Sequence, residues 1–296
     1  MPDSEILKTL RKFEIPGLIA FGEGQGGLPR ASVTTRSSSA EIYLHGAQMT
    51  RFQRHNEPPL LFLSRESRFG PGKAIRGGVP ICFPWFGSRQ GDVAHGFARI
   101  TDWDLVGAAP NPDGGVTLSF RFPETPVRAS WPAFSAEFIA TIGETLTMEL
   151  VVTNREKNRN FEFEECLHTY FAVADINGIS LTGLGSTQYL DRTQNDARQI
   201  ESEEPIQIRA QTDRTYLDTT STVEIRDPLL RRTIRIEKSG SSSTVLWNPW
   251  TTQVLSDFGP DEYRQMVCVE SGNVGRNRVI LGSAQTVRLK VRLSSF

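Results

Sequence analysis

The chain has 296 residues, and its 33 Lys and Arg nearly balance its 34 Asp and Glu, giving a formal net charge of −1. This balance argues against a nucleic-acid-binding protein and against a polybasic membrane protein. No apolar run approaches the roughly 20 residues that span a bilayer, and no long apolar segment follows the acidic start, so we expect neither a membrane helix nor a secretory signal. The three widely separated cysteines, Cys82, Cys166 and Cys268, favour a reduced, cytoplasmic protein without a structural disulfide.

Residues 1–30 are expected to form a short helix and a glycine-rich loop. The loop, Gly22–Pro29, contains a Gly-x-Gly-x-x-Gly pattern, but no helical pattern follows it, which excludes a dinucleotide site. The helix is predicted by apolar residues at helical spacing after a possible cap at Ser4, namely Ile6, Leu7, Leu10 and Phe13.

From Ala31 onward the pattern is that of β-strands. Thr145–Asn154 and Thr286–Leu293 alternate apolar and polar residues most regularly. With few helical segments between them, such strands predict one large antiparallel sandwich or barrel over residues 31–296, with Asp191–Glu204 as an exposed loop. Further short strands are expected at Glu41–Leu44, Met49–Gln53, Leu60–Leu63, Val116–Phe122 and Phe134–Ile142.

A histidine follows an alternating segment near the middle of the chain. Residues 161–166 read Phe-Glu-Phe-Glu-Glu-Cys, which predicts a strand, and Cys166 and His168 should share one face of it. From this stretch alone, a hydrogen-bonded core histidine is the more common interpretation. Other parts of the chain change that balance.

Lys73–Gly87 is apolar and aromatic, yet Pro80 and Pro84 prevent a regular central strand. Such a loop lines a pocket or plugs the end of a barrel, and the sequence favours neither. Arg76 is followed by two glycines, which allow a close backbone approach or a positive φ. A buried guanidinium there would require an anionic or polar partner.

Three further motifs are weak when taken singly. His95 and Arg99 flank Gly96, while Trp247 and Trp250 are most simply core residues on a turn. Glu270 is expected at the end of an apolar strand, where it either meets solvent or is partnered and functional.

Taken together, five motifs resemble the hexose-6-phosphate mutarotases, also called glucose-6-phosphate 1-epimerases, a branch of the aldose 1-epimerase superfamily. The resemblance implies the galactose-mutarotase-like β-sandwich, in agreement with the all-β pattern. The motifs occur in the family's order, as Arg-Gly-Gly-Val-Pro at 76–80 with Phe83-Pro84, His-Gly-Phe-Ala-Arg at 95–99, Leu-His-Thr-Tyr-Phe at 167–171, Trp-Asn-Pro-Trp at 247–250 and Cys-Val-Glu at 268–270.

The same resemblance implies roles for single residues. His168 and Glu270 match the family's catalytic pair, which opens and closes the sugar ring by general acid–base catalysis without metal or cofactor. Glu270 would act as carboxylate base and His168 as imidazolium acid. The residues that match substrate-binding positions or a pocket histidine are Arg76, Arg99, Asp213 and His95.

Guanidinium groups suit a phosphate, so a phosphosugar substrate is favoured over a free sugar. The family's glutamine before the His-Gly motif is Ala94 here, and Gln90 is the residue that could replace it. Two alternatives remain open. One is a non-catalytic carbohydrate-binding or sugar-sensing protein, and the other is a metal-dependent β-barrel enzyme with His95, His168 and Glu270 as ligands. A monomer is expected.

Overall fold

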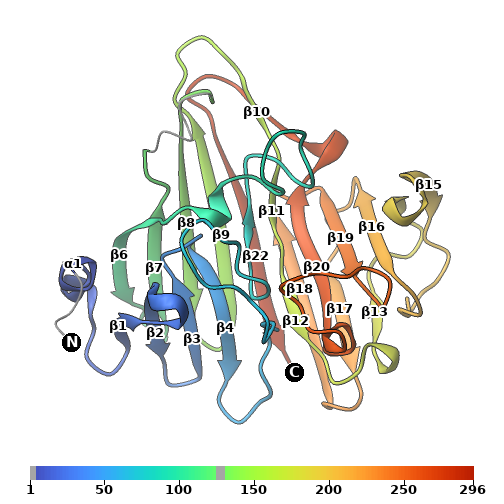
Figure 1. Cartoon of the computed structure of the whole chain (residues 1–296), viewed down its shortest axis with the longest axis horizontal. Helices are drawn as coiled ribbons and strands as arrows, with labels where there is room; N and C mark the ends of the chain where they lie inside the picture. The colour runs from blue at the N-terminus through green and yellow to red at the C-terminus, as the bar shows by residue number, and fades with distance from the viewer. Residues whose placement is uncertain (1–4, 125–130) are drawn as a thin grey trace.

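The computed structural model describes residues 5–124 and 131–296, and it consists of antiparallel strands with one short helix (Figure 1). The predicted all-β class is therefore confirmed. Helix α1 spans Glu5–Leu10, whereas the suggested cap Ser4 lies outside the described residues. Within the described part of the chain, no helix is long and apolar enough to cross a membrane. Short 3-10 turns occur at Arg11–Phe13, Gln25–Gly27, Ala98–Ile100, Ile176–Gly178, Arg192–Gln194, Glu262–Gln265 and Gly275–Asn277.

The first sheet has the strand order β1-β2-β3-β4. Its first hairpin partly corrects the predicted loop at Gly22–Pro29, because the ends of that segment belong to β1 and β2 and only residues 24–28 connect them. Residue 30 lies within β2, and the division of the chain at that residue stays a prediction. The strands are β1 Ile19–Glu23, β2 Pro29–Thr34, β3 Ser38–Tyr43 and β4 Gln48–Arg54.

The second sheet, here called the scaffold sheet, has the order β13-β17-β18-β22-β9-β8-β7-β6. Every second residue of β8 and β9 is buried, as the sequence alternation predicts for a sheet with one face on the core. Its strands are β6 Asp104–Pro110, β7 Val116–Arg121, β8 Phe134–Ile142, β9 Leu146–Asn154, β13 Ser180–Thr182, β17 Val223–Asp227, β18 Arg232–Ser239 and β22 Thr286–Ser295.

The third sheet, here called the site sheet, has the order β15-β14-β16-β19-β20-β11-β5, with β12 also paired to β20. A separate pair joins β10 to β21. The site-sheet strands are β5 Ile81–Cys82, β11 Glu165–Leu167, β12 Tyr170–Ala172, β14 Gln188–Asp191, β15 Ala197–Ile200, β16 Thr212–Leu217, β19 Ser243–Asn248 and β20 Met266–Asn273; the separate pair is β10 Phe161–Phe163 and β21 Val279–Leu281.

Four sequence predictions are wrong in detail. Leu60–Leu63 is not a regular strand, because only isolated bridges form there. Asp191–Glu204 is not simply an exposed loop, since it contains β15, which adds an edge strand next to β14. The segment 161–166 is divided at Glu164 between β10 and β11, which belong to different sheets. Glu270 does not end its strand, because β20 continues to Asn273.

One hydrophobic core joins the three sheets. In Figure 1 the scaffold sheet runs behind the other two, with β1–β4 in front of one part and the site sheet in front of the other. The layers meet through buried side chains that belong to a single core, for example Ile42 and Phe52 from the first sheet, Phe138 and Leu150 from the scaffold sheet, and Leu246 and Val267 from the site sheet.

Candidate active site

The central strands of the site sheet present different residues to their two faces. Val267 and Val269 of β20 point into the hydrophobic core, whereas Cys268 and Glu270 lie on the opposite face. Every residue of β20 is buried, so this opposite face is covered as well. The carboxylate of Glu270 is thereby held inside the protein.

Neighbouring strands place further pocket residues on that face. Val245 and Trp247 of β19 are paired with Glu270 and Cys268 of β20, and Asp213 of β16 is paired with Trp247. Three of these strands therefore contribute to one floor. His168 follows β11 at the edge of the same floor, next to β20.

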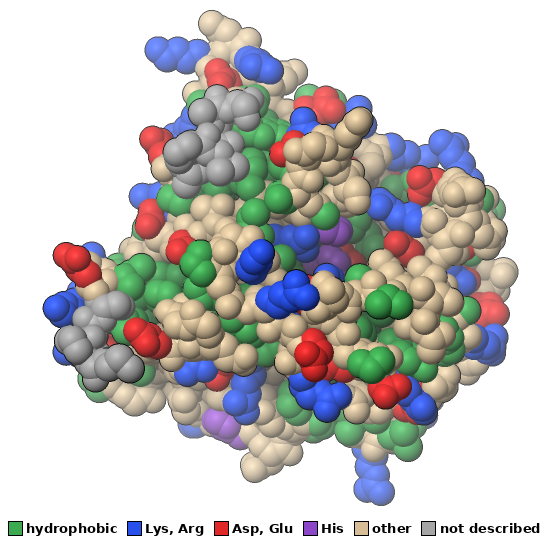
Figure 2. Space-filling model, in the orientation of Figure 1, with side chains coloured by type: hydrophobic (Ala, Val, Ile, Leu, Met, Phe, Trp, Pro, Cys, Tyr) green, Lys and Arg blue, Asp and Glu red, His purple; other side chains and the backbone are tan. Residues whose placement is uncertain are grey.

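Above this floor lies a pocket of about 310 Å³, which is within the range of small-molecule sites. Figure 2 shows it as a hollow near the middle of the face, with histidine side chains at its bottom and basic side chains beside them. All six residues selected from the sequence line it. The lining residues are Arg76, Phe86, Gly87, Ser88, Ala94, His95, Arg99, His168, Arg192, Asp213, Val245, Trp247, Gln253, Leu255 and Glu270.

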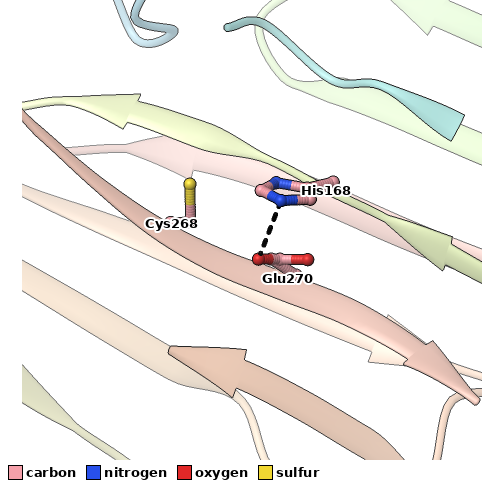
Figure 3. A group of neighbouring side chains, drawn as sticks. All are labelled: His168, Cys268 and Glu270. Carbon is pink, nitrogen blue, oxygen red and sulfur yellow. Dashed lines mark ion pairs between the residues drawn. The ribbon is translucent and has the colours of Figure 1, made fainter. Parts of the chain in front are cut away.

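His168 and Glu270 are in direct contact, although 102 positions separate them in the sequence. The imidazole Nε2 lies 3.3 Å from the Glu270 Oε1, and the two side chains face each other, His168 from the segment between β11 and β12 and Glu270 from β20 (Figure 3). The Cys166 thiol donates a hydrogen bond of 3.6 Å to the other carboxylate oxygen, Oε2. The expected shared face of Cys166 and His168 is thus confirmed.

Burial makes charge separation costly at this pair. Desolvation lowers the pKa of His168 well below its usual value, with His95, Arg99 and Arg76 adding to the effect. Desolvation also raises the pKa of Glu270 well above its usual value, and Asp213 raises it further. These shifts favour the neutral form of both residues, with the proton on Glu270, in place of the carboxylate and imidazolium expected from the sequence. Either arrangement holds one proton between the two residues.

Arg76 is held from two sides at the pocket wall. Its Nη2 lies 3.1 Å from the Asp257 carboxylate, and its Nη1 donates to the Tyr170 hydroxyl at 3.1 Å. Gly77 and Gly78, both with positive φ, let this segment approach neighbouring backbone, because a Cβ at Gly78 would overlap the Met49 carbonyl oxygen. The glycines after Arg76 therefore serve the close approach predicted from the sequence.

The loop that carries Asp257 is fastened by a buried carboxylate. Glu262 accepts hydrogen bonds from the Gly259 N–H at 2.8 Å, the Ser64 hydroxyl at 2.6 Å and the Arg65 N–H at 2.9 Å. The Ser64 hydroxyl also contacts the carbonyl of Asp257 at 3.0 Å. The pocket wall formed by this loop is thus tied to the segment that precedes Arg76.

Arg99 and His95 lie close to His168 on the other wall. Arg99 donates to the Ala94 carbonyl at 2.7 Å, while its buried Nε has no partner among the described residues. The Nδ1 of His95 accepts the Gly87 N–H at 3.3 Å. Burial, together with Arg99, lowers the pKa of His95 to about 3, so this ring is neutral. Since Nδ1 is an acceptor, Nε2 carries the proton and is a donor.

Asp213 and Arg192 lie near the pocket mouth. Their side chains approach to 4.0 Å, and burial raises the pKa of Asp213 to about 6 although Arg192 opposes the shift. The Arg192 guanidinium also lies 5.3 Å from the centre of the Phe86 ring. Sequence reasoning missed Arg192, because it sits in the segment interpreted as an exposed polar loop.

The sequence suggested that Gln90 could replace the family's glutamine before the His-Gly motif, but the structure points to a different residue. Gln90 is exposed and is not among the lining residues, whereas Gln253 lines the pocket from the loop between β19 and β20. Ala94 lines it too and offers its backbone carbonyl to Arg99. Sequence reasoning also missed Asp257 as the partner of Arg76, since no local pattern marks a contact across 181 positions.

Comparison with known proteins agrees with this site. Residues 30–294 match the aldose 1-epimerase family. A protein from Cenchrus ciliaris named "Putative glucose-6-phosphate 1-epimerase" is 35% identical over 273 residues, which cover 88% of this chain and 82% of that protein. The crystal structure of a "putative mutarotase" from Salmonella typhimurium superimposes with a TM-score of 0.87 at 27% identity, covering 98% of this chain and 99% of the other.

A galactose mutarotase related enzyme from Lactobacillus acidophilus shares the fold, with a TM-score of 0.71 at 12% identity and coverage of 90% of this chain and 97% of the other. The expected galactose-mutarotase-like fold is therefore confirmed. The family match spans most of the sequence, and the relative from Cenchrus ciliaris is similar over nearly the whole chain. This chain belongs to the aldose 1-epimerase family.

Proposed function

We propose that this protein interconverts the α and β anomers of a hexose 6-phosphate, with glucose 6-phosphate as the expected substrate. The observation that carries the proposal is the contact of 3.3 Å between His168 and Glu270 at the floor of a pocket lined by three arginines. The relative from Cenchrus ciliaris carries the glucose-6-phosphate 1-epimerase name, which supports the same substrate. The protein is accordingly an isomerase.

The reaction needs one acid and one base close together. Ring opening removes the proton of the C1 hydroxyl and adds a proton to the ring oxygen, and both oxygens are bonded to C1. His168 and Glu270 hold one proton between them, so one residue donates it while the other accepts the proton from the sugar. After ring opening the pair again holds one proton, on the opposite residue. Rotation about the C1–C2 bond and ring closure then give the other anomer and restore the pair.

The remaining pocket residues bind and orient the sugar. Arg76 and Arg99 would bind the phosphate, which keeps that end of the substrate fixed while C1 rotates. Arg76 is already paired with Asp257, so its guanidinium is oriented before the substrate arrives. His95 would donate its Nε2–H to a sugar oxygen, and Asp213 would accept from a sugar hydroxyl. Trp247, Phe86 and Leu255 supply apolar walls.

The alternative of a non-catalytic sugar-binding protein on the same fold is not favoured by any observation, because both members of the acid–base pair are present and in contact. An arginine with a purely structural role could instead pair with a nearby surface carboxylate such as Asp92 or Asp102. Arg76 pairs with Asp257 at the pocket wall. Asp92 pairs with Arg89 and Asp102 with His45, away from the pocket arginines.

The test is an anomerisation assay on freshly dissolved α-glucose 6-phosphate, with free glucose and galactose as comparison substrates. The spontaneous rate is subtracted from each measurement. We expect rapid conversion of the phosphosugar and a much lower kcat/KM for the two free sugars. Equal rates for glucose and glucose 6-phosphate would contradict the phosphate assignment, and no acceleration of any sugar would contradict the enzyme assignment. A cytoplasmic location and a monomeric state stay predictions.

A further inference from the structure

A cysteine stands beside the acid–base pair and has no part in the proposed reaction. In β20, Cys268 and Glu270 are two positions apart and therefore project from the same face of the strand. The Cys268 Sγ, a Glu270 carboxylate oxygen and a His168 imidazole nitrogen all lie within 4.8 Å of one another. Figure 3 shows the sulfur and the imidazole on the same side of the strand that carries Glu270.

Each of these three donors is of a type that binds zinc. Thiolate, imidazole and carboxylate are the groups that bind Zn²⁺, with bonds from nitrogen or oxygen of about 2.0–2.2 Å. Two such ligands of one tetrahedral ion lie about 3.4 Å apart, from the same bond lengths. The observed distance between Nε2 and Oε1 is 3.3 Å, which matches the separation of two such ligands. The Cys268 Sγ, which lies within 4.8 Å of its two neighbours in this group, would have to move closer to complete the set.

We propose that His168, Cys268 and Glu270 bind one zinc ion, which inhibits the enzyme by occupying its acid–base pair. The fourth ligand position would face the pocket and take a water molecule or a sugar oxygen. Coordination requires that Cys268 lose its thiol proton and that the His168–Glu270 pair lose the proton it shares, and both protons go to solvent. The inhibition part of this inference rests on the proposed function. The zinc-binding part does not, because metal binding is measured without a substrate.

The affinity of the site for a cation depends on how far the positive charges of the nearby arginines are compensated by carboxylates. Asp257 compensates the charge of Arg76, and Asp213 lies near Arg192. Arg99 remains without a carboxylate partner among the described residues. This uncompensated charge weakens cation binding, so we expect a reversible inhibitory site rather than a permanently occupied structural site.

The first test measures binding without activity. Purified protein is titrated with Co²⁺ in a phosphate-free buffer, and the near-ultraviolet absorption band between thiolate and cobalt is recorded. We expect this band in the parent and in Cys82→Ala, and its loss in Cys268→Ser, which keeps nearly the same side-chain volume. Cys82 is a matched control because it is also buried and free but lies outside the donor group. Absence of the band, or its persistence in Cys268→Ser, would overturn the proposal.

The second test measures inhibition. Anomerisation is followed at increasing Zn²⁺, and each variant is normalised to its own rate in the presence of a chelator. Loss of a supporting partner typically weakens a metal site by about 10–100-fold, and loss of a ligand should cost at least as much. We therefore expect Cys268→Ser to need at least about tenfold more zinc for half inhibition, while Cys82→Ala matches the parent. Equal sensitivity of all three proteins would place any zinc effect elsewhere and contradict this site.

Discussion

The scaffold sheet and the site sheet are built by different rules. In the scaffold sheet, β8 and β9 alternate strictly between buried and partly exposed residues, and outward charges pair across strands, as Glu149 does with Lys290. In the site sheet, β19 and β20 are buried along their whole length. Polar and ionisable groups lie inside that second sheet, including Glu270 itself.

This difference separates stability from function. Buried apolar residues of the scaffold sheet stabilise the fold by removing apolar surface from water. Buried polar groups of the site sheet are costly unless they are hydrogen-bonded. Two of the buried atoms that have no partner within the described ranges, the His168 Nδ1 and the Arg99 Nε, belong to pocket residues. We infer that the polar pocket is maintained for the substrate and that the scaffold sheet supplies the stability it requires.

The largest expected effect comes from replacing one glutamate in each of the two sheets and comparing the activity of the variants. Glu270→Gln in the site sheet keeps the side-chain shape but removes the ability to exchange a proton, so kcat should fall by about 10²–10⁴-fold. Glu149→Gln in the scaffold sheet removes two ion pairs on the outward face of that sheet, to Arg288 and Lys290, and each such pair is worth at most about 1 kcal/mol of stability. Anomerisation rates and chemical unfolding of both variants provide the measurements.

His168→Ala belongs to the same test and should lower kcat by at least about 10²-fold. Circular dichroism establishes that each variant is folded. A folded Glu270→Gln or His168→Ala protein that anomerises glucose 6-phosphate at the parental rate would refute the assigned pair. A large loss of activity in Glu149→Gln would show that the two sheets are not functionally distinct.

The second prediction concerns a core residue of the scaffold sheet, whose substitution should lower stability and leave activity unchanged. Leu150 of β9 is completely buried in the core between the layers. Leu150→Ala should lower the free energy of unfolding by about 2–5 kcal/mol, because it removes apolar contacts and leaves a cavity. At a temperature where the variant stays folded, kcat should remain near the parental value. Denaturant unfolding and anomerisation are measured on the same sample, and a parallel loss of kcat would contradict the separation.

The same comparison explains what the sequence could predict. The scaffold strands β8, β9 and β22 were predicted within about two residues of their observed ends, because a strand with one buried face alternates at period two. The site strands lack that signal. β19 is buried throughout, β15 is a short edge strand in a polar segment, and β5 has only two residues.

For the site, the family motifs brought together His168, Glu270, Arg76, Arg99, Asp213 and His95, and all of them line one pocket. Local patterns had left His168 and Glu270 as ordinary core or strand-end residues. Asp257 and Arg192 were missed because their importance depends on contacts with residues far away in the chain. Register between strands decides such contacts, and a single sequence does not encode register in a form that can be read locally.

The third prediction sharpens the distinction between binding and positioning within the pocket. Arg76→Gln should lower kcat/KM for glucose 6-phosphate by roughly 10–100-fold, because hydrogen bonds to a charged phosphate are each worth about 1.5–3 kcal/mol. Asp257→Asn should cause a smaller loss in the same direction, since it frees the guanidinium without removing it. Turnover of free glucose should change little in either variant.

Asp175→Asn is the matched control, because Asp175 also pairs with an arginine, Arg264, but at the surface. It should leave the ratio of the two kcat/KM values unchanged. If Arg76→Gln reduces glucose and glucose 6-phosphate turnover equally, Arg76 holds the pocket wall and does not select the phosphate.

The smallest expected effect concerns the pH dependence, where charges around the pair should move the limits of activity without abolishing it. Activity requires one proton on the His168–Glu270 pair, so the profile should be bell-shaped. At the acidic limit the pair gains a second proton. Burial and the nearby Arg99 lower the pKa of His168, so this limit lies below the usual histidine value of about 6.5.

At the basic limit the pair loses its shared proton. Burial and Asp213 raise the pKa of Glu270, so this limit lies well above the usual glutamate value.

Two variants should therefore move opposite limits. Asp213→Asn removes a negative charge that opposes ionisation of Glu270, which lowers the pKa of that group and moves the basic limit to lower pH. Arg99→Gln removes a positive charge that opposes protonation of His168, which moves the acidic limit to higher pH. Arg264→Gln, at the surface, should leave both limits in place. The measurement is kcat/KM for glucose 6-phosphate across the pH range, with the spontaneous rate subtracted at each point. A profile that is flat, or limits that stay fixed in both pocket variants, would show that the residues carrying the proton lie elsewhere.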